Sequence, residues 1–175
     1  MIHVNSHRLL LGLVTALVFV AGIVVPVGAA EDVREGMTIS PTERRYNVKP
    51  GDTITDSFQI LNDGQTAYDF TVYGAPHGVT DKTYDTVYDE SKPCSDAYRW
   101  AQFSKSNWHA ESRETITVPF TLRISENASP GGHYGIIFAE TQPAQSDSGI
   151  TRKKRLGMVL YVTVSGDVKT EGEAT

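Results

Sequence analysis

The sequence predicts an all-β fold, an antiparallel β-sandwich of about seven to nine strands. Apolar and polar residues alternate strictly in several segments, most clearly over 115–124, where every second residue is apolar. Turn sequences rich in Pro, Gly, Asn and Asp separate these segments, and beyond residue 30 no segment shows helical periodicity over a convincing length. A sheet with one polar face needs a second layer to keep water from its apolar face, so we expect two packed sheets.

Four segments alternate well enough to be predicted as strands: 53–61, 68–73, 115–124 and 156–164. Pro119 falls among the polar positions of the third segment. Because proline cannot donate to a ladder, this strand is expected at a sheet edge or beside a bulge. The fourth segment is apolar on much of both faces, which favours a central or covered strand.

The regions between the strands read as turns and loops. Residues 74–95 alternate only weakly, and we expect a long loop with one short strand near 85–88. Residues 142–148 are small and polar, which indicates a flexible connection before the last strand. Turns are predicted at 49–52, 62–65 and 130–132, where Pro-Gly, Asp-Gly and Gly-Gly pairs occur.

The first thirty residues differ from the rest of the chain. Arg8 is followed by an uncharged apolar run over 9–25, then Pro26 and the small residues of 27–30. This order is typical of a secretory signal peptide. The alternative is an uncleaved N-terminal membrane anchor through residues 9–25, since such a run is long enough to cross a bilayer. Either interpretation places the working domain on the extracellular side of the cytoplasmic membrane.

The predicted layout is a signal or anchor over 1–30, a linker over 31–36, the sandwich over 37–168 and a flexible tail over 169–175. The net charge of −5 argues against a nucleic-acid partner, because no broad basic face is available. Cys94 is the single cysteine, so an intramolecular disulfide is excluded.

Several motifs together resemble a known family. They are Thr38–Pro41, Tyr46–Asp52, Tyr98–Trp100, Ile116–Pro119, Ala128–Tyr134 and Leu156–Val162. Their order resembles the N-terminal domain of the WxL-interacting cell-surface proteins of Gram-positive bacteria, a domain formerly of unknown function and now described as peptidoglycan-binding. The resemblance covers roughly 37–168. It implies an immunoglobulin-like sandwich on the cell surface that takes part in wall attachment or surface assembly.

The block Pro130, Gly131, Gly132, His133 and Tyr134 is interpreted as a structural motif. The glycines fit a turn that needs positive φ or a close approach of the backbone. The tyrosine is expected to fold its hydroxyl back onto nearby backbone, as in a tyrosine corner. No spacing of histidines or acids predicts a metal site, and no cofactor is expected.

Aromatic residues supply the first candidate binding site. Trp108 has polar neighbours in the sequence and is therefore expected to be exposed. Together with Tyr84 and Tyr88 it is predicted to contact a glycan or a partner. Trp100 is interpreted as core.

Basic residues supply the second candidate site. Arg152, Lys153, Lys154 and Arg155 form a dense positive patch just before the last strand. One interpretation is a solvated turn whose charges protect the start of the last strand from unwanted pairing. The other is contact with anionic wall polymers or lipid headgroups.

The leading functional hypothesis is a non-catalytic, exported cell-surface domain that binds peptidoglycan, another wall polymer or a surface-protein partner. The alternative is a chaperone-like or structural assembly module that acts by β-strand addition. An enzyme is not expected, because no catalytic signature frames the serine, histidine and acidic residues.

Overall fold

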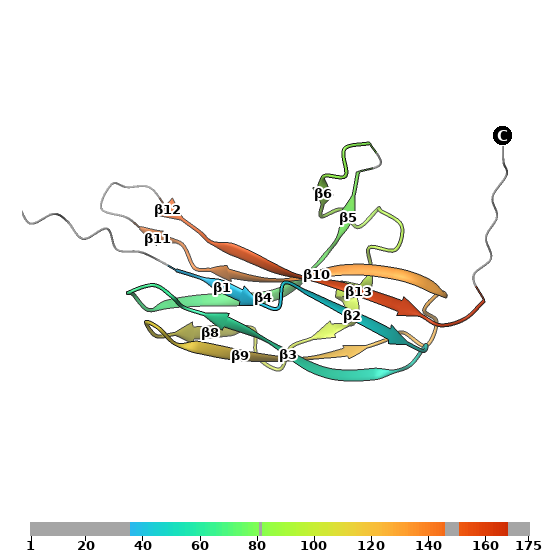
Figure 1. Cartoon of the computed structure of the whole chain (residues 1–175), viewed down its shortest axis with the longest axis horizontal. Helices are drawn as coiled ribbons and strands as arrows, with labels where there is room; N and C mark the ends of the chain where they lie inside the picture. The colour runs from blue at the N-terminus through green and yellow to red at the C-terminus, as the bar shows by residue number, and fades with distance from the viewer. Residues whose placement is uncertain (1–35, 81, 146–150, 168–175) are drawn as a thin grey trace, which may run out of the picture. The chain divides into compact units, whose positions relative to one another are not determined.

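The computed structural model describes residues 36–80, 82–145 and 151–167, and its strands form two main sheets (Figure 1). Sheet A has the order β1 (Thr38–Ser40), β3 (Thr53–Leu61), β9 (Thr115–Arg123), β7 (Ala101–Gln102). Sheet B has the order β2 (Glu43–Val48), β13 (Arg155–Val164), β10 (Gly131–Thr141), β4 (Tyr68–Pro76), β8 (Asn107–Ala110). The predicted all-β sandwich is therefore confirmed.

Neighbouring strands are antiparallel in both sheets, with one exception. The first two described strands belong to different sheets. β1 pairs antiparallel with β3 in sheet A, whereas β2 pairs parallel with β13 in sheet B. The strand β13 lies between β2 and β10, which agrees with the central position predicted from its apolar faces.

The core lies between the two sheets and is built from the alternating apolar positions. In β9 and the residue after it, Val118, Phe120, Leu122 and Ile124 are buried, whereas the residues between them are mostly exposed. Phe120 meets Phe58 across the β3–β9 pair with ring centroids 6.2 Å apart. The inner faces of β4, β10 and β13 close this core from sheet B through Phe70, Val72, Ile137, Ala139, Met158, Leu160 and Val162.

A polar cluster joins β2 to β3 along one side of the sandwich. The Tyr46 hydroxyl donates to the Asp56 carboxylate at 2.7 Å, and Arg44 Nε lies 3.2 Å from the same oxygen. Burial, together with this hydrogen bond, raises the pKa of Tyr46 well above its usual range. The cluster explains why a carboxylate interrupts the apolar phase of β3.

A short 3₁₀ helix, η1 (Ala97–Trp100), brings Trp100 into the core. Trp100 is 7% exposed, and its ring centroid lies 4.9 Å from that of His133. The interpretation of Trp100 as a core residue is confirmed.

Two small hairpins extend from the main sheets. β5 (Gly78–Val79) pairs with β6 (Thr86–Val87) in an excursion that stands out from the sandwich (Figure 1). The predicted loop over 74–95 thus contains the expected short strand, plus a partner strand that weak alternation did not reveal. β11 (Ala144–Gln145) pairs with β12 (Thr151–Arg152) where a flexible connection was expected.

The signal or anchor predicted over 1–30, most of the linker over 31–36 and the tail over 169–175 lie outside the described residues. Within the described ranges, no helix is long and apolar enough to cross a membrane. The boundaries of the sandwich at 37 and 168 stay a prediction.

Candidate functional site

The strongest candidate site is the first part of β13, which lacks a neighbour on one side. β10 pairs with β13 along its whole length, whereas β2 pairs with it only from Val159 onward. Among the described residues, the stretch Arg155–Met158 has no strand beside it on the β2 side. We call this stretch the open edge of β13.

Two backbone hydrogen bonds show which groups face the open side. Lys154 O accepts from β10 at 2.9 Å, and Val159 N–H donates to Thr42 O, just before β2, at 2.9 Å. Because successive residues of a strand direct their backbone groups to opposite sides, the even residues face β10 and the odd residues face β2. The N–H and C=O groups of Arg155 and Gly157 therefore point to the open side. Unpaired groups of this kind are a template for another strand.

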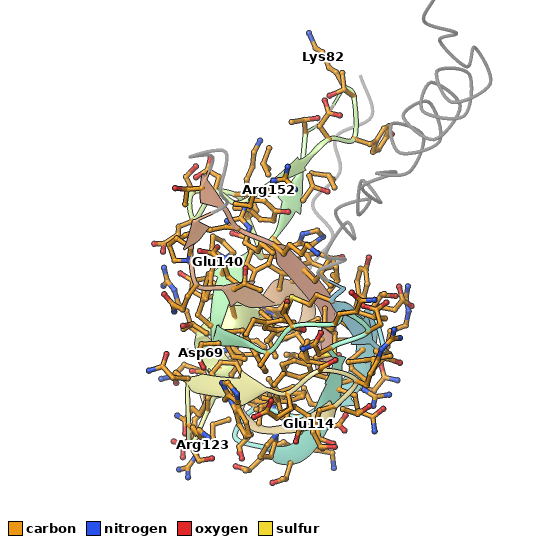
Figure 2. All side chains as sticks on the ribbon, turned by 90° about the vertical axis from the view of Figure 1, so that its left-hand side faces the viewer. Asp69, Lys82, Glu114, Arg123, Glu140 and Arg152 are labelled. Atoms are coloured by element: carbon orange, nitrogen blue, oxygen red, sulfur yellow. The ribbon has the colours of Figure 1, made fainter. Side chains whose placement is uncertain are left out.

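The predicted basic patch flanks the open edge, and half of it is neutralised by Glu140. Lys153 Nζ donates to Glu140 Oε1 at 2.8 Å, and Arg155 lies 3.9 Å from Glu140 Oε2. The Lys153 hydrogen bond, followed by one from Tyr73, lowers the pKa of Glu140. Arg152 and Glu140 lie on the side of the sandwich from which the excursion carrying Lys82 projects (Figure 2).

Arg155 also ties the excursion to the outer face of sheet B. Its guanidinium lies 4.7 Å from the ring centroid of Phe138 and 5.6 Å from that of Tyr88. The Tyr88 ring meets Phe138 edge-on at 5.1 Å. Tyr84 lies farther out on the excursion and is 77% exposed.

The structure does not join Trp108 to Tyr84 and Tyr88. Trp108 lies opposite Phe70 in the β4–β8 pair, on the inner face, and packs against the core. Its indole N–H donates to Lys105 O at 3.1 Å, and the Lys105 ammonium covers its ring at 4.5 Å. The expectation that Trp108 is exposed is wrong, because the alternation of the short strand β8 turns it inward.

The predicted turn motif is centred on His133. Gly131 has φ +119°, as the glycine interpretation expects. The buried ring of His133 contacts Asp96 Oδ1 through Nδ1 at 2.7 Å and Ser129 O through Nε2 at 2.8 Å. Tyr134 differs from the expected corner, since its ring lies on the outer face beside Tyr161, with centroids 5.9 Å apart. Its backbone N–H donates to the carbonyl of Cys94.

The groups Asp96, His133 and Ser129 resemble a catalytic triad in composition. Ser129 Oγ lies 3.4 Å from His133 Nε2, farther than the Ser129 carbonyl oxygen. A carbonyl oxygen only accepts hydrogen bonds, so Nε2 donates its N–H to that oxygen and offers no base to the serine hydroxyl. The contacts instead hold the 129–133 turn against the 96–100 segment. Sequence reasoning missed Asp96, because no short-range motif links it to His133.

Another titratable cluster lies at the other edge of sheet B. His109 on β8 contacts Asp69 through Nδ1 at 2.7 Å and Glu111 through Nε2 at 3.3 Å. The Asp69 hydrogen bond raises the pKa of His109. Across the described part of the chain, no group of three or more His, Cys, Asp or Glu side chains is placed to hold a metal ion.

Sequence comparison overturns the family prediction. The family model that matches is described as the bacterial phospholipase C C-terminal domain, and it matches residues 20–77, about one third of the chain. This match is too short to assign the chain to that family. It is nevertheless a different family from the WxL-interacting proteins, so the predicted membership is wrong, and peptidoglycan binding loses its support. No curated protein matches the sequence.

Solved structures share the fold. A PapD-like domain of human CEP192 is 16% identical, with a TM-score of 0.50, over 75% of this chain and 87% of that chain. The E. coli chaperone DraB is 11% identical, with a TM-score of 0.51, over 74% of this chain and 56% of that chain. A chain of the Salmonella enterica SafA pilin–SafB chaperone complex is 9% identical, with a TM-score of 0.51, over 75% of this chain and 55% of that chain.

These identities show the fold alone, an immunoglobulin-like, PapD-like sandwich. The chain spans a little over half the length of the chaperone chains that it matches.

Proposed function

We propose that this protein is an exported, non-catalytic assembly module that binds another protein by adding one of that protein's strands to the open edge of β13. The single observation that carries the proposal is the pair of outward-facing backbone groups at Arg155 and Gly157. An added strand gains main-chain hydrogen bonds there, while neighbouring side chains supply specificity.

The surroundings of the open edge favour a polypeptide partner. Arg155 and Tyr88 stand next to it on the outer face, and arginine and tyrosine are enriched among the residues that dominate the binding energy of protein interfaces. The same fold occurs in the E. coli chaperone DraB and in a chain of the complex between the SafA pilin and the SafB chaperone. Export rests on the signal-like pattern of residues 1–30, with residues 9–25 as a tether if that segment is retained.

The free side of β9 suits an added strand less well than the open edge of β13 does. In β9 the even residues face β3, because Ile124 N–H donates to Asp52 O and Glu114 O accepts from Asn62. The nitrogen of Pro119 therefore points away from β3, to the other side of β9. On that side β7 pairs with only two residues of β9, so most of the strand has no described neighbour there. A proline at that position removes a donor from the edge and protects it.

The test is a selection of displayed random peptides on the full chain, followed by a counter-screen on two variants. Arg155→Pro removes the outward N–H, and Arg155→Ala, the matched control, removes the same side chain but keeps that N–H. We expect selected peptides with alternating apolar residues that bind Arg155→Ala and lose affinity for Arg155→Pro. Equal binding to both variants, or a selection that returns no binder, contradicts the proposal.

A further inference from the structure

A small cavity opens at the end of sheet B where β4 begins and β10 ends. Its volume is about 60 Å³. The polar part of its lining comes from Tyr68, Thr141, Gln142, Arg152 and Lys154, together with Thr66. Among the described residues, two cations and no carboxylate line this cavity, although the chain as a whole is acidic.

Tyr68 is the least satisfied member of the lining. Its ring packs edge-on against Phe70 with centroids 6.2 Å apart, and its hydroxyl oxygen is buried without a hydrogen-bond partner among the described residues. Burial, and then the nearby charge of Asp63, raises the pKa of Tyr68 to about 12. The hydroxyl therefore keeps its proton and is a donor that lacks an acceptor. A buried donor in this state is unfavourable.

The basic patch divides between this cavity and the outer face. Lys153 and Arg155 turn to Glu140, as described above. Lys154 and Arg152 line the cavity instead, and the Lys154 backbone N–H donates to Thr141 Oγ1 at 3.0 Å. Within the described ranges, neither Arg152 nor Lys154 has a carboxylate at salt-bridge distance. Because both side chains line the cavity, both can contact a ligand bound there.

We infer that this cavity binds a carboxylate group. A guanidinium offers paired donors to the two oxygens of a carboxylate, and the ammonium adds a further donor. The volume is sufficient for one such group. The negative charge of Asp63 disfavours a bound anion, but Asp63 does not line the cavity. The two cations that do line it, Arg152 and Lys154, favour an anion. The carboxylate can come from the end of a polypeptide or from an acidic side chain, and both present the same two oxygens.

The experiment is an NMR titration of the ¹⁵N-labelled full chain. N-acetylglycine represents a terminal carboxylate, the side-chain acid of N-acetylaspartate amide represents the second source, and N-acetylglycinamide is the neutral control. We expect at least one of the two acids to cause saturable shifts of the Thr141, Gln142 and Lys154 amides, and the neutral compound to cause none. The acid with the higher affinity identifies the source.

Variants assign the binding to the cavity. Arg152→Gln combined with Lys154→Gln should weaken binding about tenfold or more, because two charge-assisted contacts are lost. Lys153→Gln, which removes a neighbouring cation outside the lining, should leave the affinity unchanged. Arg155→Pro should have no effect here, so failure of this inference and failure of strand addition can be told apart.

Three results would overturn the inference. The first is the absence of saturable shifts with either acid. The second is equal affinity in the double variant and the unaltered chain. The third is binding of inorganic phosphate at the same amides more tightly than either carboxylate.

Discussion

Proline substitutions at adjacent positions of β13 measure which backbone groups face the open side. Arg155→Pro removes an N–H that points away from β10, whereas Leu156→Pro removes one that faces Ala139 of β10. A proline that removes a ladder hydrogen bond costs about 3 kcal/mol or more, whereas one with its nitrogen on a solvent-facing edge is tolerated. The alanine variants at the same two positions correct for the lost side chains.

The magnitudes follow from the contacts. Arg155→Ala loses two cation–π contacts, with Phe138 and Tyr88, each worth about 0.5–1 kcal/mol where solvent has access. We expect Arg155→Pro to be within about 1 kcal/mol of Arg155→Ala, and Leu156→Pro to be about 3 kcal/mol less stable than Leu156→Ala. The assay is urea unfolding of the four variants, with the midpoint and slope compared. Similar proline penalties at both positions would refute the assignment of the open edge.

Three further perturbations test other parts of the structure. Gly157→Ala should lower the free energy of unfolding by about 1–3 kcal/mol, because a Cβ there would lie 2.9 Å from Ile136 Cγ1 and closer still to its Cδ1; thermal unfolding measures this. Phe120→Ala should cost about 3–5 kcal/mol in urea unfolding, since this ring is buried at the centre of the core. An NMR titration of His109 should give a pKa above 6.5 that falls toward that value in Asp69→Asn.

The sign of the histidine effect follows from its raised pKa. The folded-state pKa of His109 lies above its unfolded value of about 6.5, so its stabilising contribution is complete below that pH. The contribution is lost as the pH rises through the folded-state pKa. An unchanged histidine pKa in Asp69→Asn would contradict the proposed cause.

The sheets were predictable because alternation is a local property of the chain. The segments 115–124 and 156–164 show which residues enter the core, and β9 and β13 occupy them. Alternation does not determine which strands are neighbours. The parallel pairing of β2 with β13, and hence the point at which the open edge begins, depends on how the chain divides between the two sheets.

The candidate site was less predictable, because its parts come from distant segments. The polar neighbours of Trp108 suggested exposure, yet Asn107 and His109 face outward because Trp108 faces inward. The partner of His133 lies 37 residues away, and no spacing rule identifies it. The basic patch was visible as a run of four residues, but its division between Glu140 and the cavity required the register of β10 with β13.

Amide hydrogen exchange along β13 in the free full chain tests the open edge most directly. The amides of Leu156 and Met158 face β10 and should be strongly protected, while those of Arg155 and Gly157 should exchange at least tenfold faster, because no described group covers them. Equal protection at all four amides would show that another part of the chain already occupies this edge, and strand addition there would be excluded.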